Sequence, residues 1–136
     1  MRYLLDTNFI SELRKRERAN RGVQAWALVN DPALCAVSVM TLGEIRQGVE
    51  DVRDKDPAQA RSLEVWLKIQ ITRFGDNVLA VTAAIGDRWG RLASATNLPD
   101  VDLILAATAL EHDLTVVTRN VADFAGTGVR VLNPWK

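Results

Sequence analysis

The sequence predicts an α/β fold in which a short parallel sheet of about five strands is covered by helices on both faces. Strand-like and helix-like segments alternate along most of the 136 residues. The strand-like segments are short and apolar throughout, which is typical of parallel strands buried on both faces. The length is that of one ordinary domain, so we expect residues 1–136 to form a single domain.

Five segments are predicted to form the strands. They are apolar and mostly rich in Val and Leu, and they cover residues 2–6, 34–39, 78–81, 114–118 and 129–132. Helices are expected between them, over residues 7–18, 23–30, 41–49, 57–74, 82–96 and 101–112, with a short turn or helix at 120–124. Asp56-Pro57 marks a helix start, because Pro is favoured at the first helical position.

The composition excludes several classes of protein. Lys and Arg total 17 and Asp and Glu total 17, so the net charge is zero. Binding of long nucleic acid through the overall electrostatic field of the protein is therefore not expected, but binding through a local basic patch remains possible. The single Cys35 rules out an internal disulfide and a Cys-rich zinc site, and its apolar neighbours predict a place in the core. No segment approaches the ~20 apolar residues that span a bilayer, and the N-terminus does not resemble a signal peptide. The expected location is the cytoplasm.

Four acidic residues lie where the predicted elements bring them to one edge of the sheet. Asp6 ends the first strand, and Asp123 follows the fourth. Glu44 and Asp102 lie near the starts of two helices. Ligands of parallel α/β sheets bind at the carboxyl ends of the strands, near a switch in strand order. Crowded carboxylates repel one another unless a cation neutralises them, and oxygen ligands suit Mg²⁺ or Mn²⁺, so the pattern predicts a divalent-metal site.

Three of these acids also have a purely structural alternative. Asp6 could end a strand and begin a turn. Glu44 follows Thr41 by three residues, as in a capping box. Asp123 could cap locally against Asn120. The four acids together carry more weight than any one of them.

The fourth acid has a close neighbour. Asp100 and Asp102 lie two residues apart, so on a helix they point about 200° away from each other and do not both face one site. Asp100 follows Leu98-Pro99 and is the better helix cap. Asp102 precedes an almost wholly apolar run, where a carboxylate needs a partner. With one His, one Cys and no plausible Ser/His/Asp set, a nucleophilic side chain is not expected.

Five segments of the chain carry a recognisable pattern. They are LDTNFISE (5–12), LGEIRQG (42–48), DLILAATA (102–109), LTVVTRNVADF (114–124) and NPW (133–135). In this order and at these separations they resemble the PIN-domain ribonucleases, specifically the VapC-like toxins of toxin–antitoxin pairs. The FitB-like branch is the most similar.

The resemblance implies a three-layer PIN-like fold and a Mg²⁺- or Mn²⁺-dependent endoribonuclease that a cognate antitoxin holds inactive. In such pairs the antitoxin is usually a small DNA-binding protein, and the toxin usually forms a homodimer. The acids of the family carry over to Asp6, Glu44, Asp102 and Asp123. Supporting polar side chains beside the metal are implied at Thr7, Asn8, Thr118 and Asn120, although a turn-capping role explains Asn8 and Asn120 equally well. Asp100 departs from the pattern as an extra acid, and Leu105 is bulkier than is common there.

An RNA substrate also requires positive charge near the acids. Arg46 and Arg119 lie nearest to the predicted site, and Arg14 opens the densest basic stretch, residues 14–18. Arg46 could equally pair with Glu50, four residues on. The basic stretch could be a solvated helix end.

Four rival interpretations remain at this point. A phosphoacceptor receiver domain would need an acidic pair after the first strand and a Lys after the last one. An acid-nucleophile phosphatase would need a second Asp where Asn8 stands. A catalytically inactive protein-binding module and a DNA-acting nuclease of the same fold would both keep the overall pattern.

Overall fold

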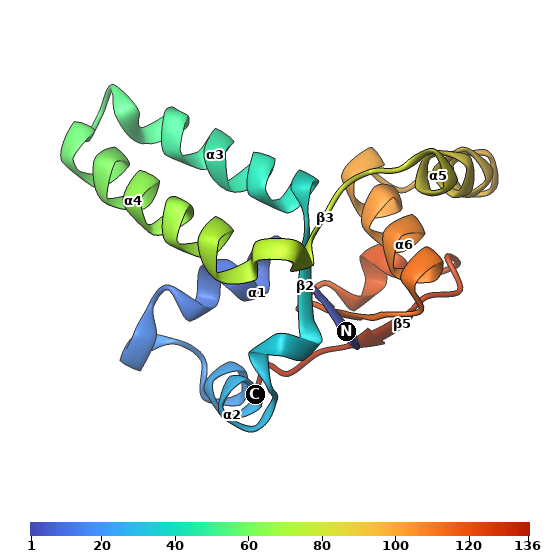
Figure 1. Ribbon diagram of the computed structural model, residues 1–136, viewed down its shortest axis with the longest axis horizontal. Coiled ribbons are helices and arrows are strands. Elements are labelled where there is room, and N and C mark those ends of the chain that lie inside the picture. The colour runs from blue at the N-terminus through green and yellow to red at the C-terminus, as the bar shows by residue number, and fades with distance from the viewer.

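A five-stranded parallel sheet forms the centre of the protein, as seen in a computed structural model that describes residues 1–136 (Figure 1). The strands are β1 (Tyr3–Leu5), β2 (Cys35–Ser38), β3 (Val78–Leu79), β4 (Thr115–Val117) and β5 (Arg130–Leu132). Their order is β3-β2-β1-β4-β5, and every pair is parallel. The predicted sheet is confirmed. Its strand order switches between β1 and β4, which lie side by side at the centre.

Six α-helices connect the strands. They are α1 (Thr7–Leu13), α2 (Arg21–Val29), α3 (Val39–Arg53), α4 (Pro57–Phe74), α5 (Ala83–Ala95) and α6 (Asp100–His112). Short 3₁₀ turns lie at η1 (Arg16–Arg18), η2 (Pro32–Leu34), η3 (Gly75–Asn77) and η4 (Val121–Phe124). Helices α3 and α4 form one projecting pair, and α5 and α6 form another across the sheet from it (Figure 1). None of the helices combines the length and the apolarity that crossing a bilayer requires.

Helices cover both faces of the sheet, as predicted. On one face, Leu4 and Val116 pack with buried residues of α6. On the other face, Leu5 and Val117 pack with α1, α2, α3 and α4. Cys35 belongs to this second cluster and is buried, and burial raises the pKa of its thiol to about 11. The predicted core role of the cysteine is therefore confirmed.

The first helix is shorter than the sequence predicts. It ends at Leu13, not near residue 18. Arg16 adopts a backbone φ of 54°, in the left-handed region that a continuing α-helix cannot use. The chain therefore leaves the helix and forms the 3₁₀ turn η1 before α2 begins at Arg21.

Helix α3 begins earlier and ends later than predicted. Ser38 is its N-cap, with the hydroxyl oxygen accepting a hydrogen bond from the Met40 N–H at 3.0 Å. The alternative of a capping box formed by Thr41 and Glu44 is therefore wrong, and the buried Thr41 hydroxyl has no hydrogen-bond partner. At its other end α3 extends to Arg53, beyond the predicted end at residue 49. The start of α4 at Asp56-Pro57 is confirmed.

The last residues of the chain pack tightly against the start of α2. Asn20 caps this helix by accepting hydrogen bonds from Gly22 N and Val23 N, and its side-chain amide also donates to the Lys136 carbonyl at 2.7 Å. A Cβ atom placed on Gly22 would lie 2.0 Å from the Pro134 carbonyl oxygen. Only glycine fits at this contact.

We predict that Gly22→Ala destabilises the protein, because the added methyl group collides with the Pro134 backbone and forces the packed end of the chain to shift. The expected loss is about 1–3 kcal/mol in the free energy of unfolding, measured by urea denaturation. Gly48→Ala in α3 is the matched control, since a Cβ there meets nothing within 4 Å. It should stabilise the helix by roughly 0.5–1 kcal/mol. Equal effects of the two substitutions would contradict the steric explanation.

Candidate active site

Asp6 and Thr118 meet at the switch between β1 and β4. Both continue the hydrogen-bond ladder beyond their strands, because Asp6 N donates to the Val117 carbonyl and Thr118 N to the Leu132 carbonyl, each at 3.0 Å. Their backbones are therefore fixed by the sheet. The Thr118 hydroxyl donates to Asp6 Oδ2 at 2.8 Å. The two residues are 112 positions apart in the sequence.

The buried Thr118 hydroxyl connects three parts of the site. Besides donating to Asp6, it accepts hydrogen bonds from Asn8 Nδ2 and from the Asn120 N–H, both at 3.0 Å. The single proton and both lone pairs of this oxygen are thus used. Since Asn120 precedes the turn η4 that carries Asp123, Thr118 ties the position of one acid to the loop of another.

Asp6 is held in one orientation. Oδ1 accepts a hydrogen bond from the Thr7 N–H at 2.7 Å, and Oδ2 accepts one from Asn8 Nδ2 at 3.3 Å as well as the bond from Thr118. Three of its roughly four lone-pair positions are occupied, so one position on Oδ1 remains for a ligand. Asp6 is also the N-cap of α1, which means that its structural and chemical roles coexist.

The other supporting residues lie beside this centre. The Thr7 hydroxyl donates to Glu44 Oε1 at 2.7 Å, which anchors α3 to the start of α1. Asn8 Oδ1 accepts a hydrogen bond from the Arg119 N–H at 3.1 Å. Side chains at positions 7, 8 and 118 therefore position the acids. Asn120 contributes through its backbone N–H.

Asp102 lies within electrostatic range of the other three predicted acids. Burial raises the pKa of Asp102 to about 6, and the negative charges of Asp123, Asp6 and Glu44 contribute to the rise. Burial also raises the pKa of Asp6, with a contribution from Asp123, while the hydrogen bonds from Thr118 and Thr7 oppose the shift. The fold thus brings together carboxylates from β1, α3, α6 and η4.

No cation of the chain neutralises this group. Every ion pair in the structure joins other residues, and none involves Asp6, Glu44, Asp102 or Asp123. As the side chains stand, no three of them are arranged closely enough to hold a metal ion. The donor chemistry nevertheless fits Mg²⁺ or Mn²⁺, since it consists of uncompensated carboxylates with raised pKa values at Asp6 and Asp102.

Two predicted capping roles are wrong. Helix α6 has Pro99 as its N-cap with no side-chain bond, and Asp100 is an exposed first-turn residue. Asp100 is not among the charges that raise the pKa of Asp102, so Asp102 is the acid that faces the group. In η4 the contact is between backbones, with Asp123 N donating to the Asn120 carbonyl, and no side chain caps the turn.

The three arginines proposed to contact RNA have different surroundings. Arg46 pairs with Glu50 of α3 and Glu64 of α4, so its charge is already compensated. Arg119 is exposed, has no ion-pair partner and lies in the loop between Thr118 and Asp123. Arg14 lies farther away, at the end of α1, where it lines a groove.

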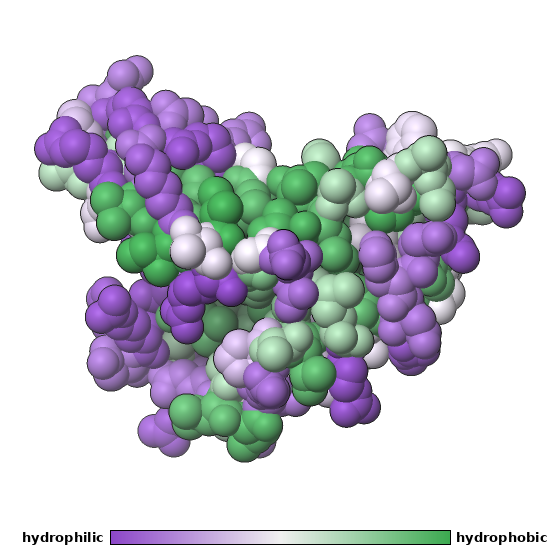
Figure 2. Space-filling view, viewed as in Figure 1, coloured by the Kyte–Doolittle hydropathy of each residue, from purple (hydrophilic) through white to green (hydrophobic).

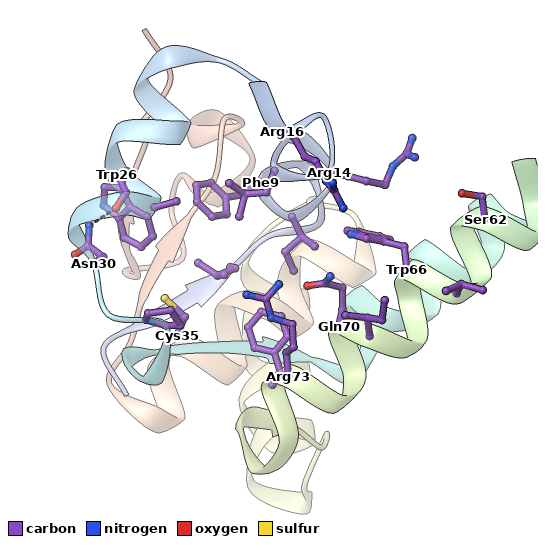
Figure 3. Close-up of a pocket in the computed structure, with 18 residues that line it drawn as sticks. Phe9, Arg14, Arg16, Trp26, Asn30, Cys35, Ser62, Trp66, Gln70 and Arg73 are labelled. Atoms are coloured by element: carbon purple, nitrogen blue, oxygen red, sulfur yellow. Dashed lines mark hydrogen bonds between the residues drawn. The ribbon is translucent and has the colours of Figure 1, made fainter. Parts of the chain in front are cut away.

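This groove, which sequence reasoning did not predict, has a volume of about 720 Å³ and lies between α1, α2 and α4. Its walls carry Phe9 and Trp26 on one side and Trp66 on the other, and Arg73 reaches into it (Figure 3). Apolar side chains also gather around the hollow below the α3–α4 pair in Figure 2, with polar ones at its rim. The sequence did contain one sign of this groove. Apolar residues are spread around α4 and are not confined to one face, which leaves Val65 and Ile69 about half exposed.

Comparisons with known proteins agree with this architecture. The PIN-domain family model matches residues 3–128. Toxin FitB of Neisseria gonorrhoeae is 34% identical over 141 residues, covering 97% of each chain. A VapC ribonuclease of Sinorhizobium fredii, Y4jK, is 28% identical over 98% of this chain and 97% of its own. The structure of FitAB bound to a DNA fragment superposes with a TM-score of 0.86 at 28% identity, covering 98% of this chain and 96% of that one.

The fold and its acidic edge therefore define a PIN domain. The chain belongs to the PIN-domain family, and toxins and ribonucleases of toxin–antitoxin systems are among its relatives. The receiver-domain alternative is wrong, because that class has the strand order 2-1-3-4-5, whereas here the order is β3-β2-β1-β4-β5.

We predict that Asp102→Asn stabilises the metal-free protein at pH 7.5 by about 1–2 kcal/mol, measured by urea denaturation. Asp102 has a folded-state pKa of about 6 against an ordinary value of 3.8, so the folded state binds its proton more tightly. The wild-type protein therefore loses stability as the pH rises from about 4 to about 6. The advantage of the variant should be present above pH 6 and vanish below pH 4. The exposed Asp100→Asn variant serves as the control, and a gain of the same size there would refute the assignment.

Proposed function

We propose that the protein is a divalent-metal-dependent endoribonuclease that hydrolyses RNA phosphodiesters at the acidic edge of the sheet. The observation that carries this proposal is the group of four carboxylates without any neutralising cation. The names of the relatives support RNA as the substrate. The whole chain acts as one catalytic domain.

Asp6, Glu44, Asp102 and Asp123 would hold the ion, directly or through water. A bound Mg²⁺ or Mn²⁺ would lower the pKa of a water molecule and offset negative charge on the phosphodiester. Asp6 offers its free Oδ1 position, and Thr118 keeps that carboxylate from rotating. Thr7 restrains Glu44 from the opposite side. Because the side chains do not enclose an ion as they stand, binding must draw the outer carboxylates inward.

The remaining alternatives make different predictions about the same site. A catalytically inactive binding module has no reason to keep uncompensated carboxylates, which cost stability at neutral pH. A DNA-acting nuclease would use the same acids. A direct comparison of RNA and DNA substrates of one sequence separates these possibilities.

We also propose that a cognate antitoxin, small and DNA-binding, holds the enzyme inactive in the cytoplasm, and that the toxin forms a homodimer. Structural relatives include FitAB bound to DNA and a toxin–antitoxin complex from Klebsiella pneumoniae. The groove between α1, α2 and α4 suits such a partner, because 11 of its 18 lining residues are hydrophobic. Exposed apolar surface of this kind marks protein-binding sites.

The partner proposal predicts that Ile69→Lys abolishes co-purification with the cognate antitoxin. Ile69 lines the groove and is 48% exposed, so a charge there would be buried on binding. Ile71→Lys is the matched control, because this residue is 43% exposed on the same helix but does not line the groove. Affinity capture after co-expression gives the measurement. Retention of the partner by the Ile69 variant would place the binding surface elsewhere.

The nuclease proposal predicts cleavage of RNA by the purified, antitoxin-free protein with Mg²⁺ or Mn²⁺, and none in EDTA. Asp6→Asn and Asp102→Asn should each lower the rate by at least about 100-fold, because each removes a carboxylate of the ion. Asp100→Asn, two residues away and exposed, should cleave normally. Gel electrophoresis of labelled RNA, and of DNA with the same sequence, reports the products. Cleavage that persists in EDTA or in the Asp6 variant would overturn the mechanism.

A further inference from the structure

The segment between α1 and α2 concentrates positive charge on a chain whose net charge is zero. We call residues 14–20 the cationic loop. It carries one acid, Glu17, and four cations, all exposed, namely Arg14, Lys15, Arg16 and Arg18. Only Lys15 forms an ion pair, with Glu12 at 3.0 Å. The other three cations have no carboxylate within ion-pair distance.

Two side chains from the neighbouring helices hold the backbone of the cationic loop in place. The Gln24 amide donates hydrogen bonds to the carbonyl oxygens of Arg16 and Glu17, both at 3.2 Å, and of Ala19 at 2.8 Å. Glu12 Oε2 accepts a hydrogen bond from the Asn20 N–H at 2.9 Å. These hydrogen bonds hold the backbone of the cationic loop in one conformation, from which its four cations extend into solvent.

Arg16 occupies a backbone conformation that does not suit it. Its φ of 54° lies in the left-handed region, which costs a non-glycine residue roughly 1–2 kcal/mol. Glycine would remove this strain. Strained residues of this kind cluster at functional sites, and here the strained position carries a guanidinium.

Helix α1 connects the cationic loop to the acidic site. It begins after Asp6 and ends at Leu13, a length of about 10 Å at 1.5 Å per residue. Asn8 and Glu12 lie one turn apart on the same side of α1, and Asn8 anchors the backbone of Arg119. The hydrogen bond from Lys15 is the main cause that lowers the pKa of Glu12, and the positive charge of Arg119 contributes to the lowering. Arg119 therefore lies near Asn8, beside the acidic site, and near Glu12, which holds the cationic loop.

We propose that the cationic loop and Arg119 bind the phosphates of single-stranded RNA on one side of the scissile bond. The inference rests on the proposed nuclease function, since four carboxylates repel a polyanion and a neutral chain has no overall field to attract one. An acidic partner segment bound in the groove between α1, α2 and α4 is the rival explanation for the positive charge. Lys15 and Arg18 do not line that groove, so such a segment would not contact them.

Fluorescence anisotropy of a labelled, unstructured 20-nucleotide RNA tests the proposal in the Asp6→Asn background, where cleavage is prevented. The Lys15→Ala/Arg18→Ala and Arg119→Ala variants should bind the RNA less tightly, by roughly tenfold for the double variant at low salt. The slope of log affinity against log salt should fall by about 0.7 for each cation removed. Arg61→Ala, an exposed cation on α4 without an ion-pair partner, is the control and should retain the full slope.

Two outcomes would overturn the proposal. One is unchanged RNA affinity and salt slope in all the variants. The other is unchanged RNA affinity together with weaker binding of poly-glutamate, which would assign the cationic loop to an acidic protein partner. The Arg18 side chain forms no hydrogen bond or ion pair in the structure. The single variant Arg18→Ala therefore tests the loss of one cation even if the double variant misfolds. Failure of the nuclease function itself is distinguishable, because it appears as absence of cleavage by the wild-type protein.

Discussion

The parallel pairing of β1 with β4 is the constraint on which the site depends. It places Leu5 opposite Val117, so the residues that follow, Asp6 and Thr118, emerge side by side at the switch in strand order. Both remain bonded to the ladder, which leaves little freedom to their backbones. The hydrogen bond between their side chains then fixes the direction of the Asp6 carboxylate. A site built on the ends of buried strands is more rigid than one built on loops.

The electrostatics of this edge oppose the stability of the metal-free protein. Burial and mutual repulsion raise the pKa of Asp102, which means that its charged form is disfavoured in the folded state. The chain supplies no lysine or arginine partner to relieve this. Arg46, which is close in sequence to Glu44, pairs instead with Glu50 and Glu64 on the projecting helices. Such an arrangement is costly for a structural acid cluster and useful for one that binds a dication.

Helix α1 brings three surfaces together within seven residues. Its first residues carry Thr7 and Asn8 beside the acids, its middle contributes Phe9 to the groove, and its end leads into the cationic loop. Trp26 packs edge-to-face on Phe9, with ring centroids 5.3 Å apart, and so ties α2 to the same helix. A protein bound in the groove would therefore lie next to both the acids and the loop.

The sequence by itself predicted the α/β class and the parallel strands, because short apolar strands are a local pattern, and it singled out the four acids as candidates. It did not determine where α1 ends or where α3 begins, since a left-handed Arg16 and a capping Ser38 override the helical pattern. Only the tertiary structure decided that Arg46 is compensated by Glu50 and Glu64, while Arg119 has no ion-pair partner. The groove, too, arises from helices that are separate in the chain. These outcomes depend on which side chains of separate helices and loops meet in the folded chain, and spacing along the sequence does not specify such contacts.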